Sequence, residues 1–140
     1  QPLDSNQSRV LPMIGAPVET VRVNELGKRH LSTLKRRTGI KNWNVICRWA
    51  LCLSLADPSR PPVIDKGNWS NVEMSWSTFA GQYRELYALV LQARCQQDGF
   101  EGGQEVLAEQ FRLHLHRGLT NLVSREETRD LKGFLGLVAS

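Results

Sequence analysis

Basic side chains are concentrated in one short part of this 140-residue chain. From Arg22 to Arg48 the sequence holds eight Lys or Arg residues and a single acid, Glu25, so the local charge is +7. The whole chain carries only +4, and the remaining residues therefore sum to −3. Because long cations without balancing carboxylates attract phosphate groups, this segment has the charge expected of a polyanion-binding site.

The spacing of these cations indicates how they would meet a polyanion. Positions seven apart share a helix face, so Lys28 aligns with Lys35, and Arg29 aligns with Arg36. No Asn or Gln is interleaved among these cations to pair with adenine, which predicts contacts to phosphates rather than to bases. A solvated helix face that binds nothing is the alternative interpretation. The candidate DNA-binding residues are Arg22, Lys28, Arg29, Lys35, Arg36, Arg37 and Lys41.

The elements that must position these cations follow from local patterns. Residues 20–23 alternate between polar and branched apolar side chains, which predicts a short strand. Asn24 suits a helix N-cap and Gly39 suits the end of the same helix, with cations favoured in its last turn. We expect its inward stripe to be Leu26, His30, Leu31 and Leu34.

A second helix is predicted over residues 43–56, capped by Asn42 or Asn44 and ended by Asp57 and Pro58. Its only clearly polar interior positions are Arg48 and Ser54. A helix that is apolar on all sides must be buried on all sides, and a chain of this length can hardly cover it alone. We therefore expect a homo-oligomer that buries this helix between subunits.

The rest of the chain reads as a mainly α, single domain of four to five helices over residues 18–140, preceded by a flexible arm over 1–17. An irregular loop is expected over 57–72, and a third helix from Ser75 or Ser77 to Gln97. A fourth helix runs over 104–117, where Gly118 ends or kinks it, and a capping box over 124–127 predicts a last short helix to about 133. The third helix has an inward stripe of Phe79, Tyr83, Leu86, Tyr87, Val90 and Leu91.

Residues for catalysis or metal binding are not arranged in any usable spacing. His114 and His116, two apart on a helix, point to opposite sides and cannot share a zinc ion. The glycine-rich segment 99–103 lacks the Lys-Ser/Thr of a phosphate loop. No apolar run reaches the length of a membrane span. We therefore expect no enzyme activity, no cofactor and no metal, and three buried, reduced, unbridged, slowly reacting cysteines in a cytoplasmic protein.

Three segments of the chain have a distinctive sequence: L-S-T-L-K-R-R-T-G-I at 31–40, N-V-I-C-R-W-A-L-C-L-S-L at 44–55, and F-R-L-H-L-H-R-G-L at 111–119 with its H-x-H-R-G signature. Together they resemble the DndE family of DNA phosphorothioation proteins. The resemblance implies a small helical homotetramer that acts beside a cysteine desulfurase, an adenylating sulfur-transfer protein and an ATPase. It also implies binding to double-stranded, preferably nicked, DNA through surface lysines, a role that falls here on Lys28, Lys35 and Lys41 with their arginine neighbours.

Two other functions remain open from the sequence. The order strand, helix, glycine turn, helix is also that of a ribbon-helix-helix repressor, in which Thr20 and Arg22 would read bases. The long third and fourth helices have no place in a minimal repressor, and the cations lie mainly on the first helix. The other alternative is a structural adaptor that holds further subunits of the sulfur-modification complex.

Overall fold

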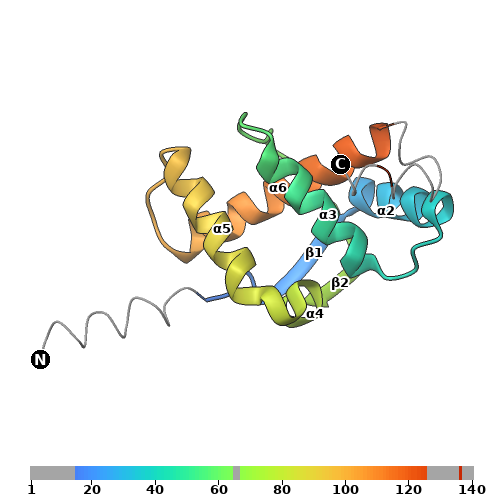
Figure 1. The fold of residues 1–140 in the computed structure, drawn as a ribbon, viewed down its shortest axis with the longest axis horizontal. Helices are drawn as coiled ribbons and strands as arrows, with labels where there is room; N and C mark the ends of the chain where they lie inside the picture. The colour runs from blue at the N-terminus through green and yellow to red at the C-terminus, as the bar shows by residue number, and fades with distance from the viewer. Residues whose placement is uncertain (1–14, 65–66, 126–135, 137–140) are drawn as a thin grey trace, which may run out of the picture.

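A computed structural model describes residues 15–64, 67–125 and 136 and shows a short two-stranded sheet surrounded by helices (Figure 1). The described chain begins with a strand followed by two helices, which is the order of a ribbon-helix-helix protein, and continues as a helical body. These features confirm the predicted mainly α fold of a single domain. The expected arm over 1–17 lies largely outside the described residues, and so does the expected last helix. The elements are β1 (Thr20–Asn24), α2 (Glu25–Thr38), α3 (Trp43–Ala56), β2 (Trp69–Ser75), α4 (Trp76–Ala80), η1 (Gly81–Tyr83), α5 (Arg84–Gln97) and α6 (Gln104–Ser124).

β1 forms an antiparallel pair with β2 of the same chain. Val21 and Val23 point into the core while Thr20 and Arg22 are exposed, as the alternation predicts. β2 lies partly inside the segment expected to be an irregular loop, so that prediction is wrong for its last part. The segment 69–75 mixes three apolar residues with four polar ones, and pairing with β1 makes it a strand.

The ends of α2 are as predicted. The Asn24 side chain accepts a hydrogen bond from the Gly27 N–H, and Gly39 takes the left-handed conformation at the other end (φ 76°). The predicted inward stripe is partly wrong, because Leu26 is 46% exposed and His30 is only half-buried. Gly27 faces inward instead, since its missing side chain lets α2 approach Val23 and His116 closely. The buried stripe is Gly27, Leu31, Leu34 and Thr38.

α3 and α6 form the main helix contact of the molecule. Gly118 lies directly against the Ala50 carbonyl, where an added Cβ would sit 1.8 Å from the oxygen. The expectation that the fourth helix ends at Gly118 is therefore wrong: α6 continues to Ser124, and this glycine serves close packing. α3 is not covered on all sides within the chain, because Trp49 is 40% exposed.

The third predicted helix is broken in two. Gly81 adopts φ 62° and ψ −139°, which no regular helix allows, so α4 ends there and α5 starts after η1. The break turns part of the predicted inward stripe outward. Phe79 and Leu91 are buried, whereas Tyr83, Leu86 and Val90 are exposed. Among the described residues no helix is long and apolar enough to cross a membrane.

Candidate nucleic-acid interface

The cations of α2 lie in three rows along the helix. Arg29 and Arg36 are exposed on the outer face. Lys28 and Lys35 are half-buried on the side toward β2 and α3, and Arg37 is half-buried on the side toward α6. The seven-residue spacing therefore places each pair on one face, as the sequence predicts.

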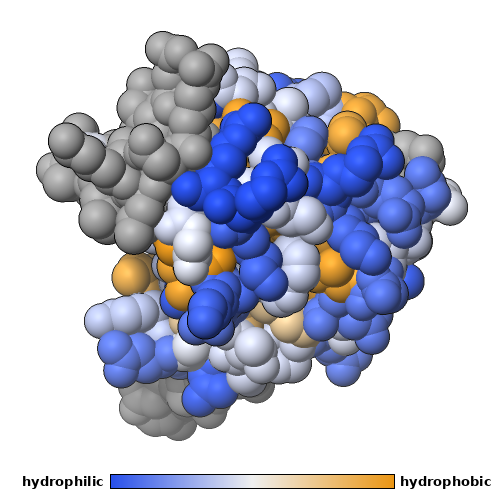
Figure 2. Space-filling view, turned by 90° about the vertical axis from the view of Figure 1, so that its right-hand side faces the viewer, coloured by the Kyte–Doolittle hydropathy of each residue, from blue (hydrophilic) through white to orange (hydrophobic). Residues whose placement is uncertain are grey.

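The outer row is the most accessible part of this surface. In the described part of the chain, neither Arg29 nor Arg36 makes a side-chain hydrogen bond or ion pair, and neither does the exposed Lys41 in the turn after α2. Figure 2 looks onto the side of the molecule that carries α2 and this turn, and strongly hydrophilic residues predominate there. These three cations are thus free to meet phosphates. We call Arg29, Arg36 and Lys41 the outer cations.

The flanking cations are already engaged within the protein. Lys28 donates to the Asn71 side chain at 2.8 Å, and the Lys35 ammonium lies 4.1 Å from the centre of the Trp43 ring. Arg37 donates to the Val123 carbonyl at 3.0 Å. These contacts hold the flanking cations close to the protein surface, while each keeps part of its charge open to solvent.

Arg22 lies on β1 rather than on α2. Its guanidinium is 3.5 Å from the Glu73 carboxylate and 5.4 Å from the centre of the Trp69 ring. An exposed ion pair of this kind contributes little to stability, but it does offset the charge of Arg22. The eighth cation of the segment 22–48, Arg48, donates to the Phe79 carbonyl at 2.7 Å and so ties α3 to α4.

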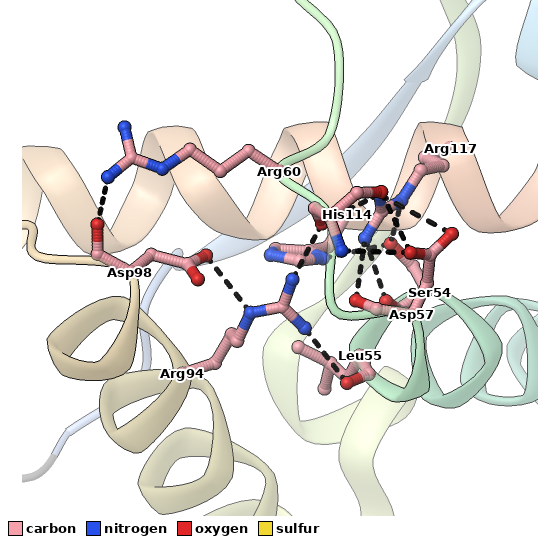
Figure 3. Close-up of polar contacts among 9 residues, drawn as sticks. Ser54, Leu55, Asp57, Arg60, Arg94, Asp98, His114 and Arg117 are labelled. Carbon is pink, nitrogen blue, oxygen red and sulfur yellow. Dashed lines mark hydrogen bonds and ion pairs between the residues drawn. The ribbon is translucent and has the colours of Figure 1, made fainter.

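A second group of arginines is buried beneath the surface and holds the end of α3 (Figure 3). Arg117 donates to the Ser54 carbonyl and hydroxyl, both at 2.8 Å. Arg94 donates to the Leu55 carbonyl at 2.9 Å and pairs with Asp98 at 3.0 Å. Because the last carbonyls of a helix lack partners within it and carry partial negative charge, two guanidinium groups satisfy and stabilise the α3 C-terminus.

His114 completes this buried group. Its Nδ1 lies 2.8 Å from the Ser54 hydroxyl, a distance that would also suit a serine nucleophile and its base. Both side chains are fully buried, however, and Arg117 already donates to the same hydroxyl, so a substrate has no route to it. Burial, together with the charges of Arg94 and Arg117, lowers the pKa of His114 to about 4. The imidazole is therefore neutral at pH 7, and the pair serves packing.

His116 points to the other side of α6, as the spacing predicts, and fixes the start of α2. The Asn24 backbone N–H donates to its Nε2 at 3.0 Å, while its Nδ1 lies 2.7 Å from the Arg112 carbonyl. The tautomer that satisfies both contacts carries the proton on Nδ1. The H-x-H-R-G motif thus joins α6 to α3 through His114, Arg117 and Gly118, and to the β1–α2 junction through His116.

The cysteines are unbridged, but the prediction that all of them are buried is wrong. Cys47 and Cys95 are buried and Cys52 is exposed. Burial raises the pKa of the Cys47 thiol to about 12. Partial burial also raises the pKa of the Cys52 thiol. This effect outweighs the hydrogen bond with Tyr87 and the nearby charge of Arg48, both of which lower the pKa. Within the described residues no cluster of His, Cys, Asp or Glu could hold a metal ion.

Solved structures with the same fold are known. A crystal structure of DndE from Escherichia coli B7A, involved in DNA phosphorothioation modification, has a TM-score of 0.59 and 21% identity, covering 75% of this chain and 97% of its own. A crystal structure of a mutant DndE, involved in DNA phosphorothioation, also has a TM-score of 0.59, with 19% identity over 77% of this chain and 99% of its own. No curated protein sequence gives a significant match. The sequence model described as DNA sulphur modification protein DndE matches residues 20–130, so this chain belongs to the DndE family.

Proposed function

We propose that this protein binds duplex DNA through the phosphate backbone, without catalysis of its own, as a component of a DNA sulfur-modification system. The observation that carries the proposal is the set of outer cations, which extend from α2 and its following turn without acidic partners in the described part of the chain. Such cations attract a polyanion at long range and bind phosphates at contact. The proposal implies a cytoplasmic protein that meets the chromosome and the other proteins of the system.

The binding mode follows from the residue types. Each cation that contacts a phosphate releases condensed counterions, so affinity falls steeply with salt. Since the outer face of α2 carries arginines and no amide side chain between them, we expect no reading of base sequence. A nick removes the stacking continuity of the duplex and lowers the cost of bending it onto a rigid protein face, so nicked DNA should bind better than intact DNA.

The proposed active form is a homotetramer. Three apolar side chains of α5, Leu86, Leu89 and Val90, are 55%, 48% and 41% exposed, and Tyr83 directly before α5 is 55% exposed. Apolar side chains gathered on one helix face are typical of a protein contact. α5 and α2 lie at opposite ends of the molecule (Figure 1), so contacts through α5 leave the outer cations open to DNA. Sedimentation of the wild type and of Leu86→Glu tests this: the wild type should sediment as a tetramer and the variant as smaller species.

The DNA proposal is tested by titrating nicked, intact and single-stranded DNA of two unrelated sequences over a salt series. Arg36→Ala and Lys41→Ala should weaken binding equally on both sequences and each lower the log-log salt slope by about one unit. Arg84→Ala is the matched control, because it removes the same charge from an exposed position on α5. Unchanged affinity and slope in both α2-side variants would show that the outer cations are only a solvated face.

The same titration separates the two alternatives. A repressor would show preference for one sequence that Arg22→Ala abolishes, although β1 here pairs within the chain and Arg22 already contacts Glu73. An adaptor would form the oligomer and bind no DNA at any salt concentration. Equal affinity for both sequences, with a steep salt slope, supports the backbone binder over both.

A further inference from the structure

A cavity of about 620 Å³ opens beside the outer row of α2. Its walls come from the first turns of α2, the segment 57–64 after α3, Asn68, and the last turns of α6. The volume is in the range of pockets that hold a small organic ligand. Arg29 lines this cavity and also belongs to the outer cations, so the cavity and the proposed DNA face share a boundary.

The charged groups of the cavity floor are already satisfied. The Asp57 carboxylate accepts from the Ser59 N–H at 2.9 Å and its hydroxyl at 2.7 Å and lies 3.7 Å from Arg117, and these contacts hold the pKa of Asp57 below its usual range. Arg60 is turned toward the Asp98 carbonyl and the Phe100 ring. Among the described residues that line the cavity, the charge left unpaired is therefore that of Arg29, which suits one phosphate.

The walls combine apolar and amide side chains. Leu26 and Val63 are 46% and 83% exposed, and Pro62 and Ile64 continue the apolar wall. The side-chain amides of Asn68 and Asn121 have no hydrogen-bond partner in the part of the chain that the structure describes. Apolar walls for a flat ring, free amides for its polar edge and a cation at the rim are what a nucleotide requires.

We propose that this cavity receives one unstacked nucleotide of the DNA bound along α2, an inference that rests on the proposed DNA binding. The base enters between the Leu26–Val63 wall and the amides of Asn68 and Asn121, and its phosphate stays at Arg29. A nucleotide beside a strand break leaves the stack at lower cost than one inside an intact duplex. The cavity thus supplies a second structural reason for preferring nicked DNA, in addition to the lower cost of bending it.

The test uses duplexes with 2-aminopurine beside a nick and the same sequence without the nick. For the wild type, 2-aminopurine fluorescence should rise on binding the nicked duplex only. Thr120→Trp fills the cavity from an exposed position on its wall, and Asn121→Leu removes one amide. Both variants should lose the fluorescence rise and about tenfold in affinity for nicked DNA, or about 1.4 kcal/mol, and keep their intact-duplex affinity.

Two controls locate the cause. Gln96→Trp adds the same aromatic side chain at an exposed position of α5 and should change nothing. Arg36→Ala should weaken both duplexes and keep the fluorescence rise at saturation. A rise that persists in Thr120→Trp, with folding confirmed by circular dichroism, overturns the cavity assignment. Binding of the wild type to nicked DNA without any rise also overturns it and leaves the DNA proposal standing, whereas absence of all DNA binding overturns both.

Discussion

Arginines occupy two opposite settings in this protein. Arg29 and Arg36 are exposed on α2 and have no partner among the described residues. Arg94 and Arg117 are 6% and 8% exposed, and their guanidinium groups donate to backbone carbonyls and to two serine hydroxyls and pair with the carboxylates of Asp57 and Asp98. The side chains are chemically identical, yet one pair is available to a ligand and the other pair is part of the core.

The difference shows why local charge is only a first indication of a binding site. A buried guanidinium must have its donors satisfied, because an unpaired buried charge strongly destabilises the fold. An exposed guanidinium has no such requirement and retains its donors for a phosphate. The two settings therefore predict opposite consequences of mutation: loss of stability at the buried group and loss of DNA binding at the exposed one.

The largest effect on stability is expected at Gly118, where α6 packs against the backbone of α3. Gly118→Ala places a methyl group 1.8 Å from the Ala50 carbonyl oxygen and must force α3 and α6 apart. We expect the free energy of unfolding to fall by more than about 3 kcal/mol, measured by urea denaturation. Gly103→Ala is the control, because nothing lies within 4 Å of its Cβ. Equal stability of the two variants would contradict the close α3–α6 packing.

Arg117→Ala should cost about 3 kcal/mol of folding free energy, because it leaves the Ser54 and Ser59 carbonyls without this donor. Arg117→Lys tests geometry at constant charge. A single ammonium cannot reach Ser54, Asp57 and Ser59 together, so this variant should recover only part of the loss. Full recovery by lysine would show that charge alone, and not the guanidinium fork, stabilises the end of α3.

Acid should weaken the buried group selectively. The folded protein lowers the pKa of His114 from 6.5 to about 4, so between these values the unfolded chain binds the extra proton. Stability is therefore complete above pH 6.5 and falls as the pH drops toward 4, on the order of 3 kcal/mol. His114→Gln should flatten this part of a melting-temperature profile. An unchanged slope would assign the acid sensitivity to other groups, including His116, whose pKa burial also lowers.

The smallest effect on stability is expected on the outer face of α2. Arg36→Ala should change the free energy of unfolding by less than about 0.5 kcal/mol, because its side chain has no partner to lose in the described part of the chain. Thermal melts of this variant beside Arg117→Ala compare the two settings directly. A destabilisation of Arg36→Ala as large as that of Arg117→Ala would show that the exposed setting is also structural.

Local patterns alone were sufficient for several features. Asn24 and Gly39 end α2 as predicted, because capping depends on a few neighbouring residues. The seven-residue spacing placed Lys28 with Lys35 and Arg29 with Arg36, because helix geometry is fixed. The opposite directions of His114 and His116 follow from the same geometry. The family was also recognisable, since the motifs that carry the resemblance are contiguous in the sequence.

Other features depend on contacts between distant segments. Strand β2 exists because β1 lies beside it, and the α4–α5 break needs the positive φ of Gly81 that sequence periodicity does not reveal. Gly118 looked like a helix end, but close approach to Ala50 makes it a packing position inside α6. Which arginines are free was also decided by tertiary structure. Residue type fixes a charge, whereas the carbonyls and carboxylates brought near it by folding determine whether that charge is left for a ligand.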